Sequence, residues 1–92
     1  MNFVLYCVDK PGHGQVRADN RPAHLDYLKS KLDSIVIAGP MTNDAVDAVL
    51  GSMLVIEAAD RAEAEAFAAG DPYAKAGLFD KVEIKAYKKV LP

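Results

Sequence analysis

The amino-acid sequence predicts one α+β domain, residues 1–92, in which an antiparallel four-stranded sheet carries two helices on one face. Apolar residues alternate with a period of two, or run continuously, in four short segments that are typical of strands. In two segments between them, apolar residues repeat at the spacing of a helix. The length of 92 residues and the apolar fraction of 51% suit a single domain with its own core.

The first strand is expected over residues 2–9, where Phe3, Leu5 and Cys7 fall on one face. It ends at the glycine- and proline-containing residues 10–14, which are typical of a loop. Cys7 is the only cysteine, so no intramolecular disulfide can form. No basic residue adjoins Cys7 to activate its thiol, and we expect a small buried apolar side chain rather than a nucleophile.

The first helix is expected over residues 21–32. Asp19 or Asn20 can cap its N-terminus, and Pro22 suits the first turn because its missing N–H would have no partner there. The leucines that repeat at helical spacing form the expected buried stripe: Leu25, Leu28 and Leu32.

Two further strands follow, with a hairpin segment between them. The first is expected over residues 34–38 and to stop at Gly39 and Pro40, because this dipeptide is a strong turn signal. Residues 41–50 are polar with scattered apolar side chains, and the sequence leaves their conformation open. The next strand is expected over residues 51–58.

The C-terminal part is predicted to form a second helix and a last strand. The helix is expected over residues 61–69, with Asp60 as its N-cap and Gly70 as its C-cap. The last strand is expected over residues 80–90. The resulting order, β-α-β-β-α-β, is that of the ferredoxin-like fold, in which the first and third strands are central.

The first and third strands are apolar on both faces, although two helices cover only one face of the sheet. The other face would expose more contiguous apolar surface than monomers usually leave open. We therefore expect a homodimer in which two sheets pack face to face.

Charge and motifs argue against several classes of function. The 11 basic and 13 acidic residues give a net charge of −2, which argues against binding to nucleic acid or to an anionic membrane surface. The N-terminus lacks a signal-peptide pattern and no apolar run is long enough to span a bilayer, so the cytoplasm is the expected location. Nucleotide-binding glycine motifs, Cys-x-x-Cys pairs and metal-ligand spacings are missing, and we expect no cofactor and no metal.

Two residues are the main candidates for chemistry. His24 lies at the border of the leucine stripe and is either a packed histidine or a general acid or base, since imidazole exchanges protons near neutral pH. Asp71 precedes Pro72 and is expected to cap a short helix that extends to about Gly77. Asp71 is also a candidate to orient the imidazole of His24, and this function is compatible with capping, because a capping carboxylate can also orient an imidazole.

Other polar residues have more than one interpretation. Arg17 and Arg21 flank the start of the expected helix and either hold an anionic substrate or are solvated. Asp9 ends the first strand and either terminates it or belongs to a site. Tyr73 is either a site hydroxyl or a core ring, and His13 lies in a glycine-flanked loop. Spacing alone does not decide between these interpretations.

Short motifs follow one another along nearly the whole chain. They are Asp9-Lys10, Arg21-Pro22-Ala23-His24-Leu25, Ala38-Gly39-Pro40-Met41, Asp71-Pro72-Tyr73 followed by Gly77-Leu78-Phe79, and Lys88-Lys89-Val90. Each is weak alone, but together and in this order they resemble the YciI-like, or YCII-related, family. The resemblance implies a dimeric α+β barrel of the ferredoxin-like kind, with a site centred on His24 and Asp71.

The resemblance also implies a small ring-shaped ligand, since the family includes a dehydrochlorinase that acts on a chlorohydroxyquinol. The residues that we expect to contact the ligand are Asp9, Arg17, Arg21, Gly39, Pro40 and Tyr73. One hypothesis is a cofactor-free enzyme of the lyase or isomerase type, in which His24 moves a proton and Asp71 orients the imidazole. A second is a non-catalytic small-molecule binder or accessory protein. A third is purely structural, with His24 packed and Asp71 acting only as a cap.

Overall fold

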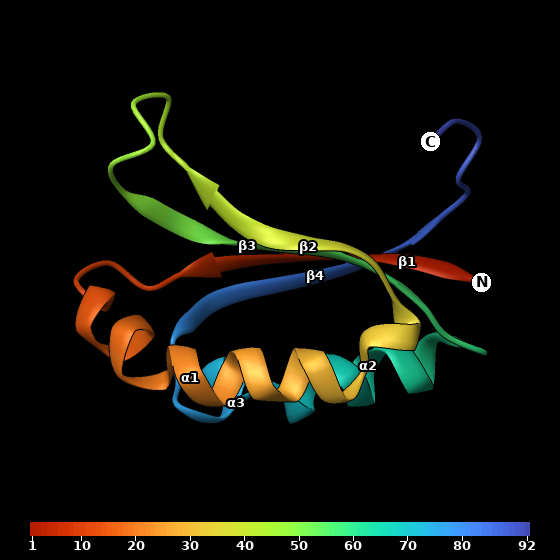
Figure 1. Ribbon diagram of the computed structural model, residues 1–92, viewed down its shortest axis with the longest axis horizontal. Helices are drawn as coiled ribbons and strands as arrows, with labels where there is room; N and C mark the ends of the chain where they lie inside the picture. Colours follow the sequence, from red (N-terminus) through yellow and green to blue (C-terminus); the bar gives the residue numbers. More distant parts are fainter.

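The computed structural model describes residues Met1–Pro92 and has the predicted order of strands and helices. Its strands are β1 (Asn2–Asp9), β2 (Ile35–Thr42), β3 (Val49–Glu57) and β4 (Phe79–Tyr87). Its helices are α1 (Gly14–Ser30), α2 (Arg61–Gly70) and the short α3 (Pro72–Lys75), and a 3₁₀ turn spans Leu32–Ser34. The strands form one antiparallel sheet with all the helices on one face, which confirms the predicted α+β fold (Figure 1).

β1 and β3 are the two central strands, as predicted, in the order β2-β3-β1-β4. In their register Leu5 lies opposite Leu54, and Phe3 lies opposite Ile56. All four side chains are almost completely buried. Apolar cross-strand pairs of this kind stabilise an antiparallel sheet, so the centre of the sheet is also the centre of the core.

α2 closes the core over β1 and β4 with small side chains. Ala64 is completely buried and Phe67 is 8% exposed, and both belong to the cluster that contains Phe3 and Leu5. Alanine lets the helix approach the strands closely, while Phe67 contributes a large apolar surface. The apolar core therefore lies between α2 and the central strands.

α1 begins at Gly14, about two turns before the predicted start, and neither Asp19 nor Asn20 caps it. Pro22 lies inside the helix rather than in its first turn. It cannot donate a hydrogen bond to the carbonyl of Ala18, and its ring crowds that carbonyl, which bends a helix. Figure 1 shows α1 changing direction after its first turns. The proline therefore marks a bend and not an N-terminus.

The leucine stripe of α1 is shorter than predicted. Leu25 and Leu28 are half-buried, and Leu28 packs against the core cluster. Leu32 is 65% exposed, because it follows the helix in the 3₁₀ turn and points away from the interior. α1 therefore has a narrower apolar face than α2.

β2 runs through Gly39 and Pro40, where the sequence predicts a stop. β2 is an edge strand, and an edge can accept proline where its missing N–H would face solvent rather than a neighbouring strand. Pro40 lies opposite Ser52 in the ladder with β3. Residues 43–48 then form the turn between β2 and β3, so pairing with β3 overrides the local turn signal.

Asp60 caps α2 as predicted, because its side chain accepts a hydrogen bond from the backbone N–H of Glu63. Gly70 is the last residue of α2 rather than its C-cap. A Cβ atom at Gly70 would lie 2.6 Å from the hydroxyl oxygen of Tyr27. The close approach of this tyrosine explains why the position carries glycine.

The last two elements are shorter than predicted at their ends. α3 ends at Lys75 instead of Gly77, and β4 ends at Tyr87 instead of residue 90. Gly77 has a φ angle of 74°, a conformation that glycine adopts without strain. The chain therefore leaves α3 through a glycine turn and enters β4 directly.

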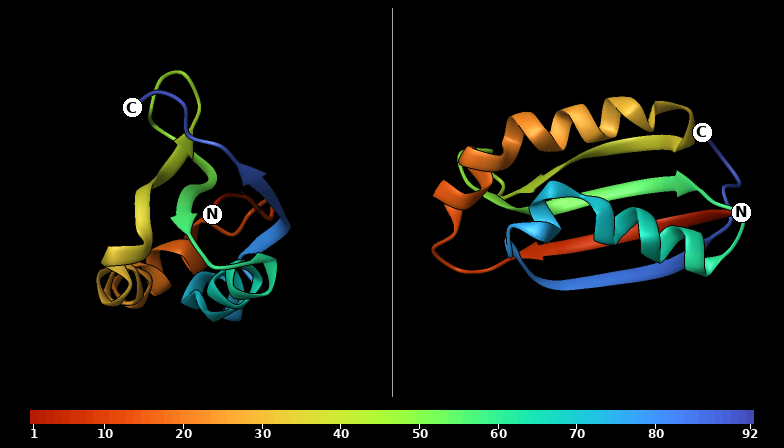
Figure 2. Two further views of the ribbon diagram at one scale, coloured as in Figure 1. Left: turned by 90° about the vertical axis from the view of Figure 1, so that its right-hand side faces the viewer. Right: turned by 90° about the horizontal axis from the view of Figure 1, so that it is seen from below.

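The face of the sheet opposite the helices is uncovered in a single chain, as Figure 2 shows from the end of the molecule. The side chains of Tyr6 and Ile37 are 44% and 54% exposed there. Val4 and Met53 lie on the same face and are half-buried. No helix has both the length and the apolar character needed to cross a membrane.

Candidate active site

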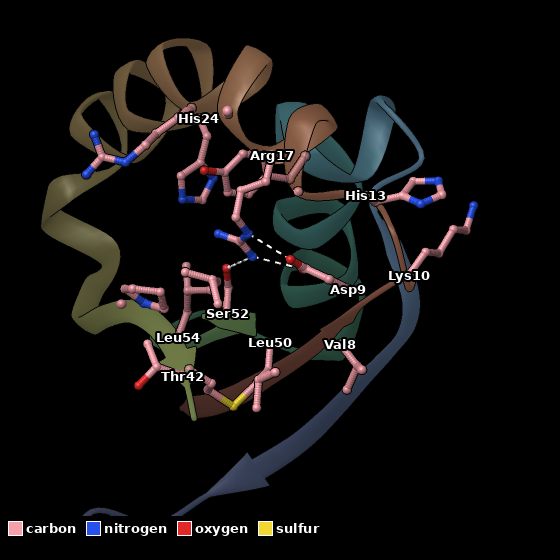
Figure 3. Close-up of a pocket in the computed structure, with 18 of the residues that line it drawn as sticks. Val8, Asp9, Lys10, His13, Arg17, His24, Thr42, Leu50, Ser52 and Leu54 are labelled. Atoms are coloured by element: carbon pink, nitrogen blue, oxygen red, sulfur yellow. Dashed lines mark hydrogen bonds and ion pairs between the residues drawn. The ribbon is translucent and has the colours of Figure 1, made fainter. Parts of the chain in front are cut away.

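A wide cleft separates α1 from the strands β2 and β3, because α1 packs chiefly against α3. Its volume is about 1310 Å³. The α1 residues that line it recur every three or four positions and share one helix face: Arg17, Arg21, His24, Leu25 and Leu28. The strands provide the facing wall: Ala38, Gly39, Pro40, Ser52 and Leu54. Figure 3 shows this cavity with the helix wall and the strand wall on either side.

His24 and Asp71 meet beside this cleft. The Nδ1 atom of His24 lies 2.8 Å from Oδ1 of Asp71, and the two residues are only 7% and 4% exposed. An ionised carboxylate can only accept hydrogen bonds, so Nδ1 carries the hydrogen and Nε2 is the ring nitrogen left for a ligand. Figure 3 shows the imidazole directed into the cavity. A residue of α1 and the residue between α2 and α3 thus form one buried pair.

Asp71 is fixed in place by the start of α3. The same Oδ1 atom accepts the backbone N–H of Tyr73 at 2.9 Å, so Asp71 also caps this helix. One carboxylate oxygen of Asp71 therefore both caps α3 and contacts the imidazole of His24. A carboxylate held by a helix terminus restricts the orientation of the histidine that it contacts.

Tyr73 forms a flat surface against His24. The two rings are stacked with their centroids 3.9 Å apart and their planes 14° apart. The Cζ atom of Arg17 lies 4.6 Å from the Tyr73 ring centre. Burial raises the pKa of the Tyr73 phenol, and the positive charges of Arg17 and Arg21 partly offset this effect. Tyr73 is a buried ring that also lines the cleft.

Arg17 is held by two partners inside the cleft (Figure 3). Its Nε and Nη2 atoms donate to the two carboxylate oxygens of Asp9 at 2.8 and 2.9 Å. Nη2 also donates to Oγ of Ser52 at 2.9 Å. Burial alone would lower the pKa of the Arg17 guanidinium, but the hydrogen bonds and the charge of Asp9 outweigh burial and raise it. Arg17 is therefore a fixed cation and not a solvated surface residue.

The sequence prediction missed Ser52. It lies on the same face of β3 as Leu54 and Ile56 and is 3% exposed. The available signal was one hydroxyl within an alternation of apolar side chains. The function of this hydroxyl becomes evident only in the structure, where Arg17, from a distant segment, donates a hydrogen bond to it.

The two remaining basic candidates differ in their surroundings. Arg21 lines the cleft, is exposed, and takes part in none of the four ion pairs. The Nδ1 atom of His13 lies 3.0 Å from the carbonyl oxygen of Pro11. Figure 3 shows its ring directed away from His24 and Arg17.

Cys7 lies behind the site on the core face of β1. Burial raises the pKa of its thiol from 9.0 to about 12, and the nearby carboxylates of Asp71 and Asp9 add to the increase. A thiol in this state is a poor nucleophile, in agreement with its prediction as a small buried side chain. No group of three His, Cys, Asp or Glu side chains is arranged as metal ligands.

Comparison with known proteins agrees with the motifs and the fold. The model of the YCII-related domain matches residues 1–88. The chain belongs to the YCII-related family. The resemblance inferred from the short motifs is thereby confirmed.

Three curated relatives match over nearly the full length. Protein YciI from Escherichia coli and from Shigella flexneri is 37% identical to this chain, and the match covers 98% of this chain and 99% of the relative. An uncharacterised protein from Haemophilus influenzae is 31% identical over the same shares.

One solved structure is similar in both fold and sequence. It is 5-chloro-2-hydroxyhydroquinone dehydrochlorinase (TftG) from Burkholderia phenoliruptrix, in complex with 2,5-dihydroxybenzoquinone. The TM-score is 0.88 and the sequence identity is 38%, with 96% of this chain and 94% of that chain covered. The YCII-related fold is therefore shared along nearly the whole chain.

Proposed function

We propose that this protein is a small enzyme, without a cofactor, that moves a proton on a small cyclic or phenolic molecule in a lyase- or isomerase-type reaction. His24 is the general acid or base, and Asp71 orients it. The observation that carries this proposal is the 2.8 Å contact between His24 Nδ1 and Asp71 Oδ1 at the edge of an open cleft. A buried imidazole held by a carboxylate, with its second nitrogen unpaired, is suited to proton transfer.

The reaction follows from the position of the free nitrogen. Nε2 of His24 accepts a proton from a ring hydroxyl or a ring carbon of the bound molecule. With a ring hydroxyl as the donor, the electron pair left behind forms a C=O double bond, and the proton is returned at a ring carbon, which completes an isomerisation. Where that carbon carries chlorine, loss of a proton from a second ring hydroxyl then forms another C=O bond, shifts the ring double bond and expels chloride. Both routes conserve electrons, so no oxidant or reductant is required, and Asp71 stabilises the imidazolium that forms.

The shape of the cleft and the similar dehydrochlorinase support a ring-shaped substrate. Tyr73 provides a flat surface on one side, and Gly39 and Pro40 line the facing strand wall. Because the similar enzyme acts on 5-chloro-2-hydroxyhydroquinone, this compound is the first substrate to test. A dehydrochlorination on this chain would release chloride and a hydroxylated quinone.

The test is a turnover assay with 5-chloro-2-hydroxyhydroquinone that follows chloride release and quinone absorbance. We expect His24→Gln to lower kcat at least about 100-fold, as is typical for loss of a general acid or base. Asp71→Asn should give a smaller loss, because the amide can still cap α3 but cannot stabilise an imidazolium. His13→Gln is the matched control and should leave kcat unchanged.

Two results would count against the proposed enzymatic function. Full turnover by His24→Gln would show that this imidazole is not the proton-transfer group. Saturable binding of 2,5-dihydroxybenzoquinone, without turnover of any chlorinated or hydroxylated ring tested, would favour the non-catalytic binder.

We also propose that the protein is a homodimer that packs sheet against sheet. The support is the uncovered face that carries Tyr6 and Ile37, both large and partly exposed. Tyr6→Lys should yield a monomer in size-exclusion chromatography with light scattering, because a charge in a packed sheet interface is costly. Leu32→Lys, at an exposed leucine away from the sheet, is the control and should remain dimeric.

A further inference from the structure

Two segments project from the uncovered face of the sheet, one at each end. The hairpin arm, residues 43–50, comprises the turn after β2 and the first two residues of β3, and the C-terminal arm, residues 88–92, follows β4. Figure 1 shows both arms on the side of the sheet opposite the helices. In the left view of Figure 2 the C-terminal arm crosses from the β4 edge toward the side of β2 and β3. The two arms therefore frame the face that carries Tyr6 and Ile37.

Both arms carry apolar side chains that a single chain leaves in solvent. The three most exposed large apolar side chains of the molecule, apart from none on the helices, are Val46, Val90 and Leu91, at 73%, 76% and 77%. Val49 and Leu50, at the base of the hairpin arm, are 43% and 52% exposed. Exposed apolar side chains gathered on two projecting segments are typical of a surface that packs against another molecule.

The charges of the two arms are complementary. The hairpin arm carries Asp44 and Asp47 and no basic residue, whereas the C-terminal arm carries Lys88 and Lys89 and no acidic residue. None of these side chains takes part in the four ion pairs within the chain. Two like arms repel each other, but a hairpin arm and a C-terminal arm attract each other.

The two arms of one chain cannot meet. They leave opposite ends of the sheet, and β1, with eight residues, covers the distance between these ends, which is about 26 Å. The five residues of the C-terminal arm span at most about 18 Å when fully extended. A complementary partner for either arm is therefore supplied by a second copy of the chain.

The hairpin arm is already ordered for such a contact. Oδ1 of Asn43 accepts hydrogen bonds from the backbone N–H groups of Asp47 and Ala48 at 3.1 and 3.2 Å, and its Nδ2 donates to Oδ1 of Asp47 at 2.7 Å. Val46 has a φ angle of 59°, and strained residues of this kind are concentrated at functional sites. A segment that is ordered before binding loses little conformational entropy when it binds.

Two-fold symmetry limits how two copies can meet face to face. If the axis lies between the sheets and runs across the strands, the hairpin end of one copy lies over the C-terminal end of the other. Each hairpin arm then contacts the C-terminal arm of the second copy, and the contact occurs twice. If the axis runs along the strands, like arms meet and their charges repel. The charges of the arms therefore favour the first arrangement.

We propose that the C-terminal arm of each copy docks on the hairpin arm of the other, through ion pairs between its lysines and the hairpin aspartates and through apolar contacts of Val90 and Leu91 with Val46. This assignment rests on the proposed homodimer, because the packed sheet faces bring the arms together. It adds the segments that hold the two copies and their relative orientation. Val49 and Leu50 also line the cleft, so the contact lies at the rim of the candidate site.

Crosslinking tests which arms meet. Asp44→Cys and Lys89→Cys are made in separate chains, and the two proteins are mixed, left to exchange copies and treated with a short bis-maleimide. We expect a covalent dimer in the mixture and little in either protein alone, since Cys7 is 3% exposed and protected from the reagent. A covalent dimer formed by either protein alone, or none in the mixture, would overturn the proposal.

Charge reversal tests the attraction through the dissociation constant of the dimer, measured by analytical ultracentrifugation. Lys88→Glu combined with Lys89→Glu should raise this Kd about 10-fold, because the reversed charges repel the hairpin arm. Adding Asp44→Lys should recover part of the loss, which a folding defect would not produce. The matched control is Lys29→Glu combined with Lys75→Glu, at two exposed helix positions on the other face of the sheet, and it should leave the Kd unchanged.

The outcomes separate this contact from the homodimer itself. If wild type is a dimer and Tyr6→Lys is a monomer, but reversal of Lys88 and Lys89 leaves the Kd unchanged, the homodimer stands and the contact between the arms falls. A further loss when Asp44→Lys is added would also overturn the contact. If wild type is a monomer, the homodimer and the contact both fall. Turnover by His24 is tested independently of all these results.

Discussion

The helices α1 and α2 lie on the same face of the sheet but meet it in different ways (Figure 2). α2 directs Ala64 and Phe67 onto the strands, and the interior there is apolar and closed. α1 directs Arg17 and His24 toward the strands, and the space there is an open cleft in which these polar side chains face a largely apolar wall. The α2 side therefore provides the stability of the fold, while the α1 side holds the candidate site.

Two aspartates give the same contrast at the level of single residues. Asp60 caps α2, is exposed, and accepts one backbone N–H. Asp71 caps α3, is 4% exposed, and accepts a backbone N–H and the imidazole of His24 with one oxygen. Identical capping chemistry thus becomes part of a candidate site only where the surroundings are buried and face the cleft.

The α1 and α2 sides should differ most in the free energy of unfolding that is lost when a leucine side chain is truncated. Leu5→Ala should lower the free energy of unfolding by about 3 kcal/mol, because Leu5 is 1% exposed at the centre of the core. Leu25→Ala should cost less than about 1 kcal/mol, because Leu25 is half-buried and lines the cleft. Urea unfolding measures both. Equal losses would mean that the α1 side is packed as tightly as the α2 side.

Cys7 lies between the α1 and α2 sides, and its thiol should make the free energy of unfolding depend on pH in the alkaline range. Its pKa is raised from 9.0 to about 12 in the folded protein, so above pH 9 the unfolded chain loses this proton first. The free energy of unfolding should therefore fall as pH rises from 9 to 12, with a slope approaching about 1.4 kcal/mol per pH unit for one proton. Urea unfolding at several pH values gives the slope.

Cys7→Ala is the control for this slope, since the variant keeps every tyrosine but lacks the thiol. Its stability should decline less steeply over the same pH range, whatever its absolute value. The same slope in both proteins would show that the thiol does not carry the effect.

The two capping aspartates should differ by a smaller amount. Asp60→Ala should cost about 1 kcal/mol, the usual effect of losing a helix cap. Asp71→Ala should cost about 2 kcal/mol, because it also leaves the buried imidazole of His24 without a partner. Thermal or urea unfolding tests the ranking, and a reversal of the ranking would contradict the buried pair.

Single glycine substitutions should change the free energy of unfolding only slightly, and with opposite signs at the β2–β3 turn and in α2. Val46 is 73% exposed and has a φ angle of 59°, a strained conformation for a β-branched residue. Val46→Gly should therefore raise the free energy of unfolding by up to about 1 kcal/mol. Ala66→Gly, at an exposed position in α2, should lower it by about 1 kcal/mol. Destabilisation by both variants would show that the turn is unstrained.

Local patterns were sufficient for β1 and for one cap. The alternation in residues 2–9 predicted β1 and its core face, because side chains of a strand point alternately to its two sides. Asp60 was predicted as a cap because its partner, the N–H of Glu63, is only three residues away. His24 and Asp71 were identified as candidates from their motifs, but spacing could not place them together, since 47 positions separate them.

The sequence by itself therefore determined the order of elements, because this order depends on periodicity and on contacts between near neighbours. It also identified the main candidate residues, because these lie in short motifs. Tertiary structure decided the remainder. α1 extends back to Gly14 while Arg17 bonds to Asp9 and Ser52, and β2 continues through Pro40 because it pairs with β3. In each case a partner distant in the chain outweighed the local propensity, and that partner cannot be read from the segment alone.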